Sequence, residues 1–460
     1  MSNRFLGVFL NCLYAQIEGV DRVLDNIQRM GAQAICLTPK IAWPTADGVR
    51  FPDLHVDGHQ RLVARPVWGG GEAHIKTAYP FEPNRELYQV SHYRPPDHTT
   101  DPQQHIEMPH RVIAEAKRRG MRVHLLFHPF LPPGVRDRDR PVTIDGAHPI
   151  PPLVAHNACL NAPDAEAYGL ALMQDLVQHY PEIDGLIPDW VEFGAYRLPD
   201  LFGCFCPHCE RTAREAGLDW ERMRQDVRAT WEGCHRLTHA ELRRSRRMLQ
   251  SPSALVGLLA KHPGWTDLLR FKASTVRRFY ERARATLVDM ERAAMPITAR
   301  GWPPPWNRAS GMDYGSLTDL CATVAPKLFT FDYCAIPRWY GETLQAWNPE
   351  LDESEVLDTL VEWLNLPDEN SPRSFSQYNI PAPGEAHPAL MEAYGQRLDE
   401  VSDQVGGRAL FCPIAHAYLP EHQWRDMLTT LHASRADGVW VHMYGYLSDQ
   451  KMESVREVWT

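Results

Sequence analysis

Long apolar runs are missing from this sequence of 460 residues. No stretch reaches the roughly 18 uninterrupted apolar residues that a transmembrane helix needs, so a membrane-spanning segment of that kind is excluded. Residues 1–7 also lack the basic start and the long apolar core of a secretory signal peptide. We therefore expect a soluble, cytoplasmic protein with no membrane partner.

An excess of basic residues is missing as well. Lys and Arg total 48 against 58 Asp and Glu, a formal net charge of −10, which argues against nucleic acid as a partner. Ten cysteines in a chain of this length are too sparse for a secreted disulfide framework. With 44% hydrophobic residues the composition is that of an ordinary globular protein. The sequence leaves open whether that protein is a homo-oligomer.

What the sequence does contain is a regular alternation of short apolar runs and amphipathic stretches. The apolar runs predict eight strands, over 6–13, 32–38, 121–127, 183–193, 296–301, 327–334, 408–416 and 438–444. Helical spacing of apolar residues predicts helices between and after them, among them 20–30, 105–119, 164–179 and 449–458.

Eight strand–helix pairs favour the α/β class and a single (β/α)8 TIM barrel over residues 1–460. A doubly wound open sheet is the rival, but the glycine-rich phosphate turn that usually follows its first strand is missing here. Two long segments, 40–104 and 194–264, leave the carboxyl ends of predicted strands. Because loops of this length on a barrel are usually lids or inserted units, we expect 194–264 to be an inserted subdomain.

Chemistry in such barrels lies at the C-terminal ends of the strands. This rule selects polar and aromatic candidates for substrate binding, namely Asn11, Trp68, His128, Trp302, Tyr333, His416, His442 and Tyr444. Aromatic faces stack on sugar rings, so the collection favours a carbohydrate or glycoside as the ligand. The histidines alternatively suit a metal-dependent sugar lyase or isomerase.

Three cysteines lie close together in the second long segment, at Cys204, Cys206 and Cys209. Zn²⁺ accepts four thiolates in a tetrahedral site, and compact knuckles supply several of them from one turn. The spacing therefore predicts a zinc site whose fourth ligand comes from elsewhere, with Cys159 and Cys234 as the candidates.

This region resembles the metal cluster of family-42 β-galactosidases, which are clan-A glycoside hydrolases. Those enzymes carry one cysteine, a gap of a little over forty residues, and then Cys-x-Cys-x2-Cys; here 44 residues separate Cys159 from Cys204. The likeness covers residues 159–214. It implies that Cys159 completes the site and that the zinc is structural, because four thiolates leave no open position for water or substrate.

The resemblance also points to catalytic carboxylates. Asp189 and Glu192 end the predicted strand 183–193, and Glu192 matches the family's general acid/base after one inserted residue. Val191 stands where the family has an Asn that binds the sugar's 2-hydroxyl. The family's nucleophilic Glu on strand seven has no counterpart in 408–416, which ends at His416.

The nearest substitute for that Glu is Asp332, at the end of the predicted strand 327–334, which would alternatively form an ion pair with Arg300 or Arg338. The leading hypothesis is therefore a glycosidase with Glu192 or Asp189 as general acid and Asp332 as its partner. Carboxyls about 5–5.5 Å apart predict retention and about 6.5–9.5 Å inversion; the missing strand-seven Glu favours attack by water with Asp332 as base. A carbohydrate-binding barrel without hydrolysis is the alternative.

Overall fold

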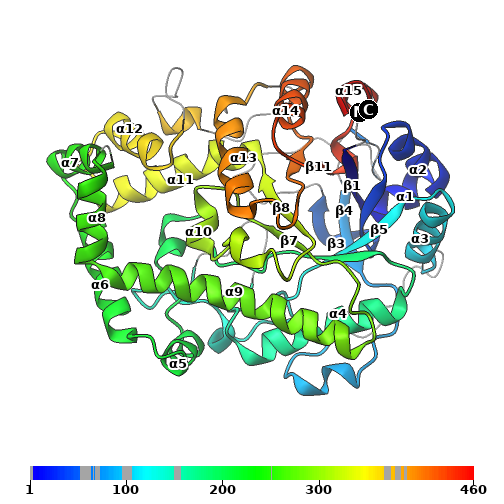
Figure 1. Ribbon diagram of the computed structural model, residues 1–460, viewed down its shortest axis with the longest axis horizontal. Helices are drawn as coiled ribbons and strands as arrows, with labels where there is room; N and C mark the ends of the chain where they lie inside the picture. Colours follow the sequence, from blue (N-terminus) through cyan, green and yellow to red (C-terminus); the bar gives the residue numbers. More distant parts are fainter. Residues whose placement is uncertain are drawn as a thin grey trace.

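The computed structural model describes residues 4–51, 64–65, 67, 73–95, 106–149, 157–249, 251–366, 374–378, 385–387 and 391–459. A ring of parallel strands lies at the centre, and helices surround it on the outside (Figure 1). None of the helices described combines the length and apolar character needed to span a membrane.

The elements alternate along the chain as the apolar pattern predicts. The strands are β1 (Phe5–Asn11), β2 (Ala34–Thr38), β3 (Ile41–Phe51), β4 (Ala73–Ala78), β5 (Arg122–Phe127), β6 (Gly185–Pro188), β7 (Thr298–Gly301), β8 (Thr323–Leu328), β9 (Leu410–Phe411), β10 (Ile414–His416) and β11 (Gly438–His442). The α-helices are α1 (Cys12–Glu18), α2 (Val20–Arg29), α3 (Met108–Arg118), α4 (Pro163–His179), α5 (Pro207–Glu215), α6 (Trp220–Cys234), α7 (His239–Leu249), α8 (Pro252–Lys261), α9 (Pro263–Asp289), α10 (Trp306–Ser310), α11 (Thr330–Trp347), α12 (Glu353–Trp363), α13 (Met391–Val405), α14 (Glu421–Ala433) and α15 (Asp449–Trp459).

The predicted (β/α)8 barrel is confirmed. Its strands pair in parallel in the order β6-β5-β2-β1-β11-β10-β8-β7. A hydrogen bond of 3.0 Å from the Leu186 N–H to the Pro296 oxygen links the two ends, so the ring is nearly closed. β9 and β10 are two pieces of one barrel strand, and the break falls at Pro413, which has no N–H to donate to a neighbouring strand.

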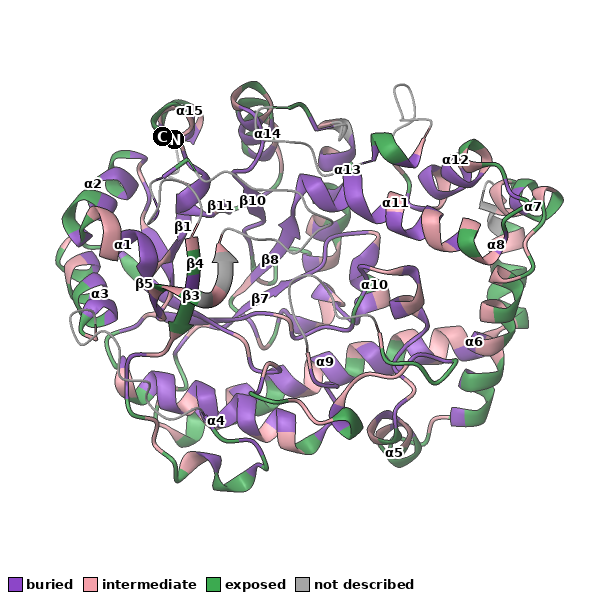
Figure 2. Cartoon of the chain, turned by 180° about the vertical axis from the view of Figure 1, so that it is seen from behind, coloured by how far each residue is buried: buried purple, intermediate pink, exposed green. Residues whose placement is uncertain are grey.

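The core lies inside the ring and between the ring and its helices. Figure 2 shows buried residues along the strands and on the helix faces turned toward them. Strands covered on both faces are apolar at nearly every position rather than alternately, as β1 and β2 are. Gly7 of β1 lies against Trp440 of β11, where an added Cβ would be only 2.3 Å from the indole. A glycine at this position therefore makes room for the large ring in the barrel.

Four predicted strands extend past the observed carboxyl ends, and one of them, 438–444, is a strand only as far as His442. The run 6–13 leaves the barrel at Asn11, and the run 183–193 is a strand only as far as Pro188. The prediction for 327–334 fails further: the strand ends at Leu328 and α11 begins at Thr330, so Asp332 lies in the first turn of a helix. An acidic side chain in a first helical turn interacts favourably with the helix dipole. The local β-branched and aromatic residues favour a strand there. Where the strand ends is set by its pairing with the neighbouring barrel strands, and this outweighs the local preference.

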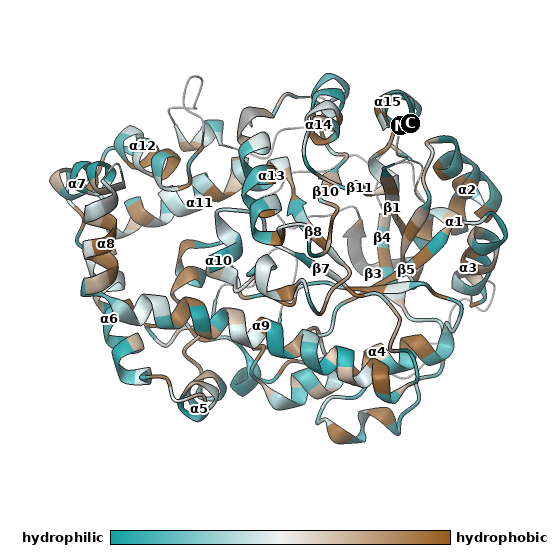
Figure 3. Ribbon diagram, in the orientation of Figure 1, coloured by the Kyte–Doolittle hydropathy of each residue, from teal (hydrophilic) through white to brown (hydrophobic). Residues whose placement is uncertain are grey.

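Besides the two long segments predicted from the sequence, the described residues include a third long segment that extends from the barrel. The segment after β2 contains the antiparallel hairpin of β3 and β4, and the segment 194–264 contains α5 to α8. A third, between β8 and β9, holds α11, α12 and α13; an ion pair of 2.6 Å between Arg246 of α7 and Glu362 of α12 joins it to the second. Figure 3 shows the apolar character of α8, where Val256 and Leu259 are more than half exposed.

Candidate active site and candidate metal centre

Four buried charges meet at the carboxyl ends of β6, β7 and β8. We call Asp189, Glu192, Arg300 and Lys327 the charged quartet; each is at most 3% exposed. Arg300 Nη1 lies 2.9 Å from Asp189 Oδ2, and the Lys327 ammonium forms an ion pair with Glu192 Oε1 and lies 3.7 Å from Asp189 Oδ1. Two positive and two negative charges balance, which is what makes their burial tolerable.

The backbone between the two carboxylates is bent by Trp190. This residue has φ +62°, a left-handed conformation that is uncommon for a large side chain. The Trp190 N–H donates to Asp189 Oδ1 at 3.0 Å, and its carbonyl accepts from Asn157 Nδ2 at 3.0 Å. Backbone conformations of this kind cluster at functional sites, where neighbouring contacts hold them.

Glu192 is held on its other side by β7 and the residue after it. The Trp302 N–H donates to Glu192 Oε2 at 2.6 Å. Gly301 ends β7 beside it, and an added Cβ there would be 2.8 Å from the same oxygen. Both Glu192 oxygens therefore have donors, and the glycine makes room for the carboxylate to reach them.

The two carboxyls of the quartet differ in acidity. Burial raises the pKa of Glu192, and the neighbouring Lys327 ammonium opposes that rise without cancelling it. Burial acts in the same direction on Asp189, but the charges of Arg300 and Lys327 outweigh it and hold the pKa of Asp189 below its ordinary value. Glu192 is therefore the carboxyl of the pair that takes up a proton more readily.

A pocket of about 490 Å³ opens beside Glu192. Trp190, Trp302 and Tyr196 line it, and the Tyr196 ring meets the Trp302 ring at a centroid distance of 4.5 Å. Lys327 lies 3.7 Å from the centroid of Trp190, a cation–π contact that brings the quartet against this aromatic wall. Of the aromatic residues predicted for substrate binding, Trp302 lines this pocket, together with Trp190 and Tyr196.

The remaining predicted residues fall into separate groups. His128 lies near the quartet, with Nε2 3.7 Å from Asp189 Oδ2. His416 and His442 pack together over β10 and β11, with ring centroids 5.1 Å apart. Tyr333 packs against Trp306 in α10 and donates to the Pro304 carbonyl at 3.0 Å.

Two further predicted residues, Asn11 and Tyr444, lie at the end of β1 and just after β11. The Asn11 amide contacts the sulfur of Met443 at 3.2 Å. Tyr444 is bonded to Asn26 and Glu18 of α2 and α1, which places its hydroxyl among the outer helices rather than at the pocket. Trp68 lies outside the described residues.

The two arginines predicted as ion-pair partners of Asp332 each lie beside another carboxylate. Arg300 lies with Asp189, and Arg338 pairs with Glu342 on its own helix. Asp332 itself is buried in the first turn of α11.

Sequence reasoning missed Lys327, Tyr196 and Asp200. A lysine inside the apolar run of β8 is a signal for Lys327, because an ammonium enters a barrel interior only with a counter-charge. Asp200 also lines the pocket; burial raises its pKa to about 6, and it accepts the Arg197 N–H at 2.9 Å. Nothing in the sequence around Asp200 distinguishes it from a residue in an ordinary surface turn.

The four predicted cysteines form one buried cluster. The Cys159 sulfur lies 3.5 Å from that of Cys209, 3.8 Å from that of Cys204 and 3.4 Å from that of Cys206. Tetrahedral coordination with Zn–S bonds of about 2.3 Å places sulfurs about 3.8 Å apart. The donor set and its spacing therefore fit a four-coordinate metal, and Cys234 is not part of this group.

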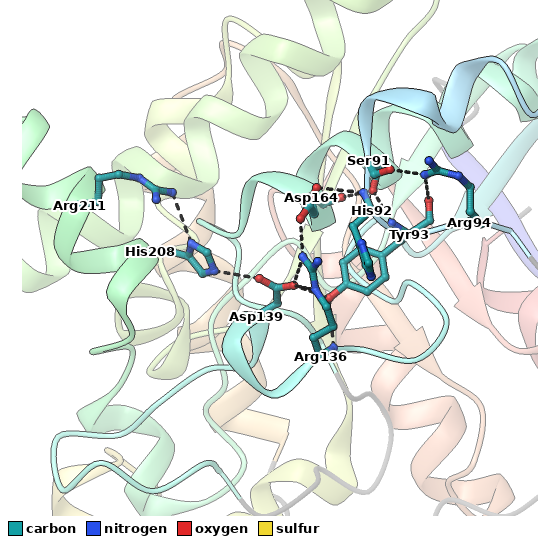
Figure 4. A network of polar contacts seen from close by, with 9 residues as sticks. All are labelled: Ser91, His92, Tyr93, Arg94, Arg136, Asp139, Asp164, His208 and Arg211. Atoms are coloured by element: carbon teal, nitrogen blue, oxygen red, sulfur yellow. Dashed lines mark hydrogen bonds and ion pairs between the residues drawn. The ribbon is translucent and has the colours of Figure 1, made fainter.

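A network of polar contacts that includes His208, Asp139, Arg136 and Asp164 lies next to this cluster (Figure 4). His208, inside the cysteine motif, bonds Asp139 at 2.9 Å, and the Asp139 carbonyl accepts the Cys159 N–H at 2.7 Å. Arg136 pairs with both Asp139 and Asp164 at the start of α4. Because Cys159 and Cys204 also line the pocket, the cluster holds one wall of it.

Replacing Lys327 by Met is expected to reduce the free energy of unfolding by about 3–5 kcal/mol. Removing one partner of a buried ion pair strands the other charge without compensation. Urea unfolding followed by circular dichroism measures the loss. Adding Glu192→Gln to Lys327→Met should recover part of it, because the stranded carboxylate is then gone. A double variant no more stable than Lys327→Met would contradict the pairing.

Comparison with known proteins gives similarity in structure alone. No family model and no curated protein sequence matches the chain. The β-galactosidase of Bacillus circulans sp. alkalophilus is similar with a TM-score of 0.50 at 10% identity, over 99% of this chain and 55% of that one. Those of Marinomonas ef1 and Halorubrum lacusprofundi give 0.51 at 8% and 0.50 at 11%, over 99% of this chain in each case and 59% and 57% of theirs.

This chain therefore spans little more than half the length of those three proteins. Identities this low establish the fold and nothing finer. The fold shared with those three proteins is the (β/α)8 barrel, and the described part of this chain adds a cluster of four cysteines.

Proposed function

We propose that this chain is a glycosidase whose general acid/base is Glu192. One observation carries the proposal: a buried carboxyl with a raised pKa lines an aromatic pocket at the carboxyl end of a barrel strand. Trp190 and Trp302 supply flat apolar faces on which a sugar ring can stack. A carboxyl desolvated in this way retains its proton more readily, which general acid catalysis requires.

The position of Lys327 controls how readily Glu192 takes up and releases a proton. The ammonium lies between Glu192 and Asp189, and Asp189 is held ionised by Arg300. A small shift of Lys327 toward Asp189 would weaken its attraction to the Glu192 carboxylate and so favour protonation of Glu192. Asp189 then acts as a positioning residue, while Glu192 exchanges the proton with the glycosidic oxygen.

We propose that the cysteine cluster holds a structural Zn²⁺. Cys159, Cys204, Cys206 and Cys209 would be its ligands, and the buried Lys272 ammonium lies near enough to offset part of the negative charge of four thiolates. The metal would fasten the loop that precedes α4 to the segment that follows β6. Its part would be to hold the pocket wall, with no open position for substrate.

Asp332 is proposed as the second carboxylate, acting as base toward an attacking water. It lies five residues after Lys327, which itself contacts Glu192. We expect Asp332→Asn to reduce kcat about 100-fold or more, the usual contribution of a general base, with little change in KM. Steady-state kinetics on an aryl glycoside measures this. Asp200→Asn is the matched comparison: full activity in Asp332→Asn, with a loss in Asp200→Asn, would assign the second carboxylate to Asp200.

A carbohydrate-binding barrel without hydrolysis is the second candidate function. Two observations favour it: both Glu192 oxygens already accept hydrogen bonds, and His416 stands at the strand-seven end where the clan has its nucleophile. The metal-dependent lyase has less support, since among the residues described the strand-end histidines do not form a group able to hold a metal.

A panel of 4-nitrophenyl glycosides of varied sugars and anomers tests these functions. Release of nitrophenol that persists with EDTA, at unchanged protein-bound metal, supports the glycosidase. Sugar binding by calorimetry without release of nitrophenol from any member would reject the glycosidase and support the binding barrel.

A further inference from the structure

A second, smaller pocket of about 170 Å³ adjoins the first, and Leu131 lines both. It lies at the carboxyl ends of β2 and β5, where Lys40 and His128 enter it. Its other walls are largely aromatic, with contributions from Tyr79, Phe81, Tyr88 and Tyr168. The pocket is large enough for one charged substituent and the part of a sugar ring that carries it.

Lys40 brings a positive charge into this pocket, and no carboxylate of the described residues pairs with it. Its ammonium lies 4.8 Å from the centroid of the Tyr79 ring. Within the described ranges no carboxylate lies at ion-pair distance from it, whereas Lys327 has both Asp189 and Glu192 beside it. Lys40 is half-buried, and partial burial lowers its pKa, the direction expected for an ammonium that loses some of its hydration.

His128 connects this pocket to the charged quartet. Burial lowers the pKa of His128 to about 4, with a further contribution from the Lys40 ammonium, so its imidazole is neutral near pH 7. A neutral imidazole offers one N–H donor and adds no second positive charge. Its Nε2 lies 3.7 Å from Asp189 Oδ2, so a group bound between Lys40 and His128 lies on the side of the site that faces the quartet.

We propose that this pocket binds a singly charged acidic group of the substrate, and that the substrate is therefore an acidic glycoside. Resting on the glycosidase function proposed above, this assigns the substrate class: a uronic acid or a sugar sulfate ester. Lys40 supplies the counter-charge, His128 supplies a neutral donor, and the aromatic walls contact the ring. One unneutralised cation matches a monoanion, and the low-dielectric surroundings strengthen their attraction.

Titration calorimetry with free sugars tests the assignment without any turnover. The probes are D-glucuronate and D-galacturonate against D-glucose and D-galactose, with the two hexose 6-sulfates as a second acidic arm. We expect at least one acidic sugar to bind about tenfold or more tightly than its neutral counterpart, the ratio that one charge-assisted contact supplies. Preference for the uronates or for the sulfates decides which source of the anion is bound.

Variants of Lys40 supply the controls. Lys40→Met should abolish the preference for acidic sugars, Lys40→Arg should keep most of it, and Lys261→Met should leave it unchanged, since Lys261 is exposed on α8. Equal binding of neutral and acidic sugars by the natural protein, binding of none of them, or an undiminished preference in Lys40→Met would each overturn the proposal.

The two proposals fail separately. An acidic preference that depends on Lys40, in a protein that hydrolyses no glycoside, sustains the anion pocket and rejects the glycosidase. Hydrolysis of neutral glycosides that requires Glu192 but is indifferent to Lys40 rejects the anion pocket and sustains the glycosidase.

Discussion

Replacing Glu192 by Gln is expected to lower kcat/KM for glycoside hydrolysis at least about 1,000-fold. Removing a general acid/base forfeits a factor of about 100 to 10,000, because no other group at that point can exchange the proton with the glycosidic oxygen. Gln has the same length, and its amide oxygen can still accept the Trp302 N–H that now donates to Glu192 Oε2. The loss should therefore appear in turnover more than in sugar binding, as kinetics and calorimetry on the same preparation will show.

Glu166→Gln is the matched control for that variant. Glu166 is also a buried carboxylate in an ion pair, with Arg282 of α9, but it lies on α4 and does not line the pocket. It should retain activity while losing some stability. If Glu192→Gln instead kept a tenth or more of the natural activity on every glycoside hydrolysed, Glu192 would not be the acid/base.

Replacing Cys159 by Ser is expected to remove the bound metal and to destabilise the fold. The natural protein should carry about one equivalent of zinc by elemental analysis. A metal present at 1,000 times its Kd stabilises the native state by about 4 kcal/mol, and that contribution disappears with the site. Thermal unfolding should accordingly begin at a clearly lower temperature in Cys159→Ser, and zinc content should fall in parallel.

Cys234→Ser is the control, since Cys234 is the rival fourth ligand and lies half-buried in α6, outside the cluster. It should keep both its zinc and its unfolding temperature. Loss of zinc from Cys234→Ser with full retention in Cys159→Ser would reverse the ligand assignment. A natural protein with less than about half an equivalent of zinc and four freely titratable thiols would reject the metal site.

The barrel could be predicted because its signal is local. Parallel strands covered on both faces must be short and apolar throughout, and each covering helix must repeat its apolar residues at helical spacing. The cysteine motif could also be recognised in the sequence, since Cys204, Cys206 and Cys209 lie within six residues. The pairing of Glu192 with Lys327 could not be predicted, because Lys327 lies 135 positions further along the chain and only barrel closure brings β6 and β8 to the same interior.

Asp332 is a second residue whose structural position could not be predicted from local sequence. Its flanking Phe331 and Tyr333 favour a strand by local propensity, but the barrel strand ends at Leu328 and a helix starts two residues later. Where a strand ends in a closed ring depends on its neighbours' register rather than on its own residues. The local sequence could therefore indicate a carboxylate near a strand end but not the element that carries it.

By itself the sequence determined the class of fold, the spacing of the thiols and the positions of candidate carboxylates, because periodicity and motif spacing are short-range properties of a chain. Only the tertiary structure decided which charges neutralise one another. It placed Lys327 between two carboxylates and, among the residues that the structure describes, put no carboxylate beside Lys40 in its aromatic pocket. The physical reason is that the acidity and the partner of a buried charge depend on the residues that folding places around it, and those come from distant parts of the sequence.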